Sequence, residues 1–194
     1  MKQNVLIPVR YIPGILTNSD KKKQGKEINK SKKLYKKNIY YTRKKIKSFK
    51  SRPSKHIINA QKMYKIEKII PSKELSSKTR CHIKGLKEIF KKGQGAYFSS
   101  GSRPNQTAHS WGYARLASAI TGGKSSAVDI KILEKYCDKT SKALKLAKKN
   151  YNKYKKGTRR VKKTTLKKWS DKYKKSIDCK NPKGFSQKQY CKYK

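Results

Sequence analysis

Acidic residues are scarce in this chain: of its 194 residues, 10 are Asp or Glu and 55 are Lys or Arg, which gives a formal net charge of +45. A far smaller excess keeps a domain soluble, so this charge predicts an anionic partner. Lysine far outnumbers arginine, which favours point-charge contacts with phosphates over bidentate contacts with bases. We therefore expect binding to a polyanion without sequence specificity.

Long apolar runs are also missing. No stretch approaches the ~20 consecutive apolar residues that a membrane-spanning helix needs. The start of the chain is apolar only briefly before Pro8 and Arg10, which does not resemble a signal peptide, so we expect synthesis and use inside a cell. Basic segments could still lie against an anionic inner-membrane surface. Because the apolar residues are thinly spread, folding is expected to be local or partner-assisted.

Cysteine and histidine form no metal-binding pattern. There is no C-x-x-C pair, and the histidines complete no zinc spacing, so we expect neither a metal nor a cofactor. The cysteines are expected to be free thiols, as is usual inside cells. The alternative for the last two is a disulfide that closes a short loop. The residues concerned are Cys81, Cys137, Cys179, Cys191, His56, His82 and His109.

Apolar residues spaced three and four apart predict a mainly α-helical fold with a small core. Residues 1–53 are expected to form a basic, largely extended N-terminal arm, and residues 138–194 a Lys-rich helical C-terminal arm and tail. The helical core would span residues 54–137, around a Gly/Ser-rich ordered loop. Four residues are assigned to core packing: Trp111, Leu116, Ile120 and Leu133.

Capping residues and glycines suggest where the core helices begin and end. Ser54 can begin one helix, and Ser76 or Ser77 can begin a second that ends at Gly93. These two helices would form either a helix–turn–helix or a plain packing pair. Turn-forming residues then predict an ordered loop, and the next helix is expected to run over residues 107–121.

The segment 93–123 stands apart because its only charged residues are Arg103 and Arg115. Two causes can remove charge from a Lys-rich chain: burial in the core, or packing against a ligand. The loop before residue 107 is either a structural, self-hydrogen-bonded loop or an anion site in which backbone N–H groups hold a phosphate. The candidate anion-binding residues are Gly95, Ser99, Ser100, Gly101, Ser102, Arg103, Asn105 and Gln106.

The one candidate for a catalytic general base in the segment 93–123 is His109. Its conceivable partners are a nucleophile or acid nearby and a carboxylate that orients the ring. The alternative is a helix cap or a packing group. The conceivable partners are Ser102, Ser110, Tyr97, Asp129 and Glu134.

Two local pairings are also expected in this part of the chain. Trp111 and Arg115, one helical turn apart, are expected to stack. Ser126 and Asp129 have the spacing of a capping box.

Three stretches of this sequence resemble a known family: GQGAYFSSGSRPNQTAHSWGYARLASAITGG, RKKIKSFKSRPS at 43–54 and SSAVDIKILEKYCDKTSKAL at 125–144. Together they are similar to an uncharacterised domain family of giant viruses, the nucleocytoplasmic large DNA viruses, which also occurs in some large phages. The resemblance covers about residues 10–144, and Phe98 replaces a tyrosine of the family. It implies a viral origin but no activity, and residues 145–194 lie outside it.

Composition and resemblance together suggest a virion structural protein that binds double-stranded DNA or attaches the genome to the inner capsid. The alternatives are a minor capsid protein that binds acidic capsomer faces, and an enzyme acting on nucleotides or nucleic acid through Arg103 and His109. The expected locations are the virion and, during assembly, the virus factory in the host-cell cytoplasm. The residues expected to contact the polyanion are Lys44, Lys45, Lys47, Lys50, Arg52, Lys148, Lys149, Lys155, Lys156, Arg159, Arg160, Lys162, Lys163, Lys167 and Lys168.

Overall fold

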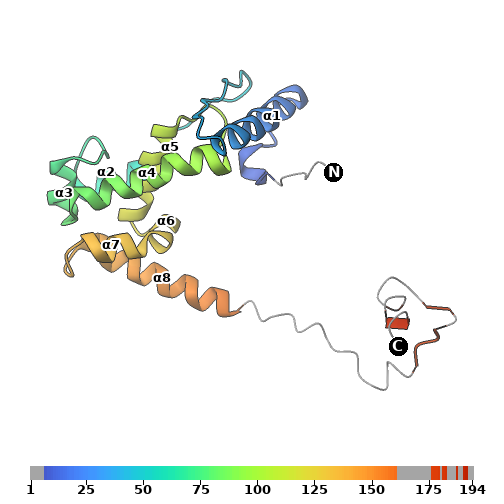
Figure 1. The fold of residues 1–194 in the computed structure, drawn as a ribbon. Coiled ribbons are helices and arrows are strands. Elements are labelled where there is room, and N and C mark those ends of the chain that lie inside the picture. Colours follow the sequence, from blue (N-terminus) through green and yellow to red (C-terminus); the bar gives the residue numbers. More distant parts are fainter. Residues whose placement is uncertain (1–6, 161–175, 180, 183–186, 188–189, 192–194) are drawn as a thin grey trace. The chain divides into compact units, whose positions relative to one another are not determined.

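A computed structural model describes residues 7–160, 176–179, 181–182, 187 and 190–191, and this part of the chain is mainly helical, which confirms the predicted fold class (Figure 1). The short 3-10 helix η1 precedes the α-helices. The helices are η1 Val9–Tyr11, α1 Asn18–Tyr35, α2 Lys55–Tyr64, α3 Lys73–Thr79, α4 Ile83–Ser100, α5 Ala108–Ile120, α6 Lys124–Val128, α7 Ile130–Tyr136 and α8 Lys142–Arg160.

Helices α4 and α5 form the centre of the fold, and α4 contacts α1, α3, α5 and α7. Gly93 does not end α4 as predicted, because the helix continues to Ser100. The reason is tertiary: a Cβ at Gly93 would lie 2.6 Å from the Cα of Gly112 in α5. The two glycines let the helices cross closely, so Gly93 serves helix packing instead of helix termination.

Burial of α4 on several sides also bears on the predicted helix–turn–helix. A recognition helix needs a free face for the major groove, whereas α4 packs against four other helices. The predicted pair is not formed as such, because Ser76 and Ser77 lie within α3, α4 begins at Ile83 with His82 as its cap, and α2 packs mainly against α5.

The helix predicted over residues 107–121 is present as α5. Thr107 caps it: its hydroxyl accepts a hydrogen bond from the Ser110 N–H, while the Ser110 hydroxyl accepts one from the Thr107 N–H. This reciprocal pair satisfies two donors that have no partner within the helix. Helix α5 then buries its small residues against α4 and α2, as the sequence pattern predicted.

The hydrophobic core draws on helices α2, α3, α4, α5, α7 and α8. Of the four residues assigned to it, Leu116, Ile120 and Leu133 are at most 1% exposed. Trp111 is half-buried, and its ring contacts that of Tyr11, which lies in η1, with ring centres 5.9 Å apart. The N-terminal segment therefore covers one end of α5.

Residues 18–35, within the arm expected to be largely extended, form the helix α1. The Thr17 hydroxyl caps it by accepting a hydrogen bond from the Asp20 N–H. The face with Gln24, Ile28 and Ser31 is buried against the C-terminal end of α4 and the turn after it. This burial stabilises the helix despite Gly25, because most helical stability in proteins comes from tertiary packing.

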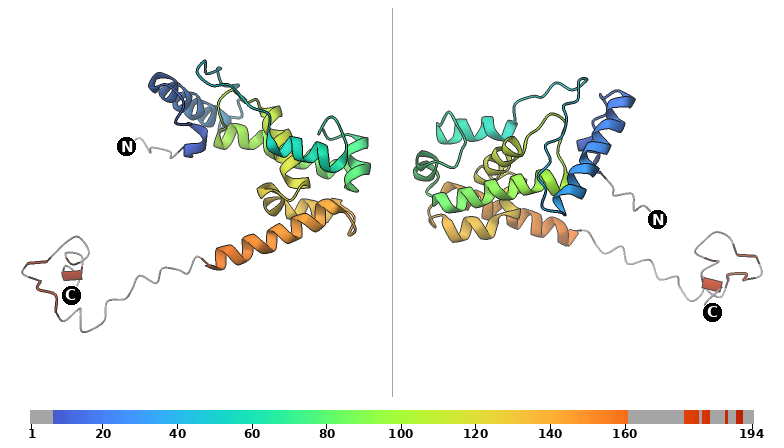
Figure 2. Two further views of the ribbon diagram at one scale, coloured as in Figure 1. Left: turned by 180° about the vertical axis from the view of Figure 1, so that it is seen from behind. Right: turned by 45° about the horizontal axis from the view of Figure 1, so that its top comes forward.

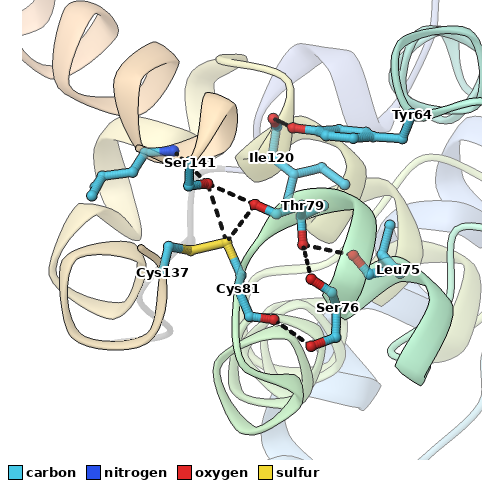
Figure 3. The surroundings of a disulfide bond; sticks show 9 residues. Tyr64, Leu75, Ser76, Thr79, Cys81, Ile120, Cys137 and Ser141 are labelled. Carbon is cyan, nitrogen blue, oxygen red and sulfur yellow. Dashed lines mark hydrogen bonds between the residues drawn. A yellow bond between two sulfur atoms is a disulfide. The ribbon is translucent and has the colours of Figure 1, made fainter. Parts of the chain in front are cut away.

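All cysteines of the described part form disulfides, which corrects the expectation of free thiols. Cys81 is bonded to Cys137, and Cys179 to Cys191, the pair left open as an alternative. Around the first disulfide the backbone forms an antiparallel bridge, with hydrogen bonds of 2.6 Å from His82 N to Tyr136 O and 2.9 Å from Asp138 N to Arg80 O. Figure 3 shows buried hydroxyl groups packed beside it.

Helix α8 packs on the core through Ala143, Leu144 and Ala147, each at most 3% exposed. The side-chain amide of Asn150 also donates hydrogen bonds to Gly123 O and Ser126 Oγ, in the segment before and within α6. The chain divides into two compact units, residues 1–155 and 156–194. The described residues of the second unit include the disulfide between Cys179 and Cys191.

Candidate functional site

The loop between α4 and α5 covers only residues 101–107, because α4 takes up the residues before it. Asn105, with a positive φ of 58°, points its amide at the segment 46–49. Its Oδ1 accepts a hydrogen bond of 2.7 Å from Ile46 N, and its Nδ2 donates to Ile46 O and Phe49 O. The loop is thus joined to a turn at residues 46–49, more than fifty residues earlier in the chain.

Arg43 is buried beneath this loop, at 9% exposure. Its guanidinium donates hydrogen bonds to Ser102 Oγ at 2.6 Å, Tyr97 O at 2.9 Å and Ser31 Oγ at 3.3 Å, and it lies 3.6 Å from the centre of the Tyr97 ring. Burial lowers the pKa of Arg43. Three hydrogen bonds and the ring offset the loss of hydration.

Half of the predicted anion-binding residues are therefore engaged within the chain. The Ser102 hydroxyl accepts from Arg43 and donates to Arg103 O. Gln106 accepts a hydrogen bond from Ser110, and Gly101, with φ of +94°, packs against Ile28. These contacts favour the structural, self-hydrogen-bonded alternative for the loop.

The remaining members of that predicted set lie along α4 and at the surface of the loop. Gly95 lies inside α4, where an added Cβ would be 3.5 Å from the Tyr35 hydroxyl. Ser99 and Ser100 are exposed at the end of α4, and Arg103 is exposed on the loop.

His109 is exposed in the first turn of α5 and lies beside Phe90, with ring centres 6.0 Å apart. Its conceivable catalytic partners have other roles: Ser102 binds Arg43, Ser110 caps α5, and the Tyr97 hydroxyl accepts from Arg43 N. Glu134 is exposed on α7. The contact with Phe90 favours the packing alternative for His109.

Asp129 is fully buried and pairs with Arg115, which corrects two predictions. Arg115 donates from Nε at 2.9 Å and from Nη2 at 2.8 Å, and Lys92 Nζ lies 4.0 Å from the same carboxylate. Asp129 therefore forms no capping box with Ser126, and Arg115 binds a carboxylate where stacking on Trp111 was expected. Both predictions paired residues that are close in sequence. A buried carboxylate instead needs a cation beside it, and the fold places Arg115 there.

Lysines line the outer faces of α1 and α8. At 100° per residue, the exposed lysines of each set fall within one stripe opposite the buried face of their helix. We call the exposed residues Lys22, Lys26, Lys30 and Lys33 the α1 ridge, and Lys142, Lys145, Lys149 and Lys153 the α8 ridge. Each ridge extends over about 16 Å of helix, at ~1.5 Å per residue.

The few carboxylates near the α1 ridge are used to hold backbone. Glu27 accepts hydrogen bonds of 2.9 Å from Tyr41 Oη and from Lys44 N. Asp20 accepts from the Ser48 N–H and hydroxyl, and these hydrogen bonds lower the pKa of Asp20. Both ion pairs found among the described residues involve Asp129 and neither ridge. Lys30 Nζ lies 4.6 Å from the centre of the Tyr41 ring, and no ridge lysine has a carboxylate partner among the ion pairs of the described residues.

The predicted contact lysines are placed only in part. Lys44, Lys45, Lys47, Lys50 and Arg52 are exposed on the stretch that carries Arg43 and Ile46 inward, and Lys148 and Lys149 are exposed on α8. For residues 155–160 the structure describes the helical backbone only. The remaining predicted contacts lie outside the described residues: Lys162, Lys163, Lys167 and Lys168.

The α1 ridge and Arg43 were not among the predicted site residues. The ridge has a sequence signal, since its lysines recur at intervals of four, four and three residues opposite Gln24, Ile28 and Ser31. For Arg43 we find no such signal, because a buried arginine in a Lys-rich run resembles its exposed neighbours.

Residues 8–132 match a protein family model described as a family of unknown function, DUF5824. No curated protein and no solved structure matches the chain. Within the described residues, we find no cluster of three or more His, Cys, Asp or Glu side chains suited to a metal. Nor does any helix there combine the length and apolarity needed to span a membrane.

Proposed function

The chain belongs to the DUF5824 family, whose function is unknown, and for this member we propose non-specific binding of double-stranded DNA as a structural protein of a virion. The observation that carries the proposal is the pair of lysine ridges without acidic partners in the described part of the chain. Each ridge presents positive charge along a straight helix, which suits a rod with one phosphate charge per ~1.7 Å of axis.

The composition of the two ridges supports binding without sequence specificity. Arginine is the commonest bidentate partner of guanine. Arg43 and Arg115 are both held by contacts inside the fold. The ridges consist of lysine alone, whose ammonium contacts phosphates as a point charge.

The viral setting of this proposal comes from the resemblance to giant-virus sequences, with the virion and the virus factory as its locations. The two disulfides are in keeping with it. Disulfides persist outside the reducing interior of cells, where a released particle spends part of its existence.

Salt-dependent binding to a duplex tests the proposal. Each engaged phosphate adds about −0.9 to the slope of log K against log salt, so one ridge of four lysines contributes about −3.6. We expect the slope of the full chain to be at least this steep and equal for unrelated sequences, measured by fluorescence anisotropy. Replacing Lys22, Lys26 and Lys33 by Glu should weaken binding and flatten the slope.

A flat salt response, or no binding to a duplex at moderate salt, would exclude the DNA proposal. Binding to acidic capsid proteins under the same conditions would then favour the minor capsid alternative. A strong preference for one DNA sequence would contradict the assignment of lysine ridges as the binding surface.

A further inference from the structure

The two lysine ridges lie on opposite sides of the α4–α5 pair within the first unit. Helix α1 packs against the C-terminal end of α4, and α8 packs beside α6. In Figure 1 the green and yellow central helices lie between the blue α1 and the orange α8, and the left view of Figure 2 shows the same order from behind.

Each ridge also faces away from the centre of this unit. The α1 ridge is opposite Gln24, Ile28 and Ser31, which are buried toward α4. The α8 ridge is opposite Ala143 and Leu144, which are buried in the core. Because each helix buries its inner face, the two rows of charge point in different directions.

One straight duplex cannot contact both ridges in this arrangement. DNA has a persistence length of about 150 bp, so wrapping a short duplex around the unit would require strong bending and a corresponding bending energy. A second duplex can reach the other ridge without deformation. It would also gain the same type of lysine–phosphate contacts.

We infer that the folded unit bridges two DNA duplexes, one on the α1 ridge and one on the α8 ridge, and so condenses DNA as well as coating it. This inference rests on the proposed function, because it needs each ridge to bind phosphate. It goes beyond that function by assigning a separate duplex to each of two surfaces of one chain. Removing either ridge should abolish bridging while leaving a site for one duplex.

A two-duplex capture assay tests the inference with the full chain. One duplex is immobilised on beads, and the recovery of a second, fluorescent duplex is measured as protein is added; anisotropy measures binding to a single duplex in parallel. Three charge-matched variants are compared. They are K22E/K26E/K33E on α1, K145E/K149E/K153E on α8, and the control K68E/K87E/K131E at exposed positions outside both ridges.

The wild-type chain and the control should capture the second duplex. Each ridge variant should capture at least about tenfold less, while its affinity for one duplex falls by less than about tenfold because the other ridge remains. Combining the two ridge variants should remove most binding by the folded unit.

Three results would overturn the inference. Bridging by single-ridge variants at the wild-type level would show that copies of the chain associate or that other lysines suffice. Binding of one duplex without capture of a second would retain the proposed function but exclude bridging. No binding by the wild-type chain in either assay would remove the proposed function itself.

Discussion

Reducing the disulfide between Cys81 and Cys137 should destabilise the helical unit strongly. To isolate it, we suggest the variant C179S/C191S, in which the disulfide of the second unit is absent. The same protein is then compared in oxidised and reduced form, so that no core atom other than the two sulfurs changes. The wild-type chain serves as the reference for the oxidised state.

The expected magnitude follows from the loop that the bond closes. Cys81 and Cys137 are 56 residues apart in sequence. For a loop of this length the chain-entropy model predicts that reduction lowers the free energy of unfolding by about 4 kcal/mol. For domains of this size ~1 kcal/mol corresponds to about 2–4 °C, so Tm should fall by about 8–16 °C.

The folded state should survive reduction at low temperature. The backbone bridge beside the bond is held by hydrogen bonds from His82 N to Tyr136 O and from Asp138 N to Arg80 O. The Ser141 hydroxyl also donates to Thr79 O at 2.7 Å, as Figure 3 shows. The effect should therefore arise mainly in the unfolded chain, which becomes more expanded and raises the urea m-value.

Circular dichroism melts and urea titrations, with and without reductant, measure both quantities. Thiol labelling under denaturing conditions verifies the redox state before each experiment. A Tm that changes by less than about 2 °C on verified reduction would refute the loop-closure reasoning. Quantitative labelling of all four cysteines without reductant would refute the disulfide assignment itself.

Two further predictions concern buried polar groups. Arg43→Lys should lower the free energy of unfolding in urea by about 2–4 kcal/mol, because an ammonium cannot reproduce the planar set of charged hydrogen bonds to Ser102, Tyr97 and Ser31. The exposed control Arg52→Lys should change it by no more than about 0.5 kcal/mol. An equal cost for both variants would contradict a special role for Arg43. Burial raises the pKa of Tyr64 to about 12. Its unfolded pKa is about 10, so its contribution to stability is complete below pH ~10 and is lost as pH rises toward ~12. Tyr64→Phe removes the hydroxyl that donates to Ile120 O. It should lower the free energy of unfolding by about 1 kcal/mol at neutral pH and flatten the fall in stability between pH ~10 and ~12. An unchanged pH dependence in the variant would show that the phenol ionises freely in the folded state.

Local sequence signals succeeded where a helix end is decided by neighbouring residues. The start of α5 depends on a cap formed between Thr107 and Ser110, three positions apart in sequence, and its burial follows from apolar residues spaced three and four apart. The same reasoning failed for the end of α4. Gly93 has the sequence appearance of a terminator, but contact with Gly112 gives it a different role.

The predicted anion loop shows how polar residues can mislead. Serine, asparagine and glycine suit both a phosphate site and a loop that binds its own chain. The choice between them depended on Arg43 and the segment 46–49, which are more than fifty residues away in sequence. No local pattern contains that information.

The sequence by itself determined the charge, the helical class and the excess of lysine over arginine, because these follow from composition and from short-range periodicity. Only the tertiary structure decided which polar groups are occupied and which way each lysine row faces. Burial of Arg43 and Asp129, pairing of the cysteines and the placement of α1 and α8 on opposite sides of α4–α5 all depend on contacts between distant segments. Those contacts are set by packing of the whole chain, which no single stretch of residues specifies.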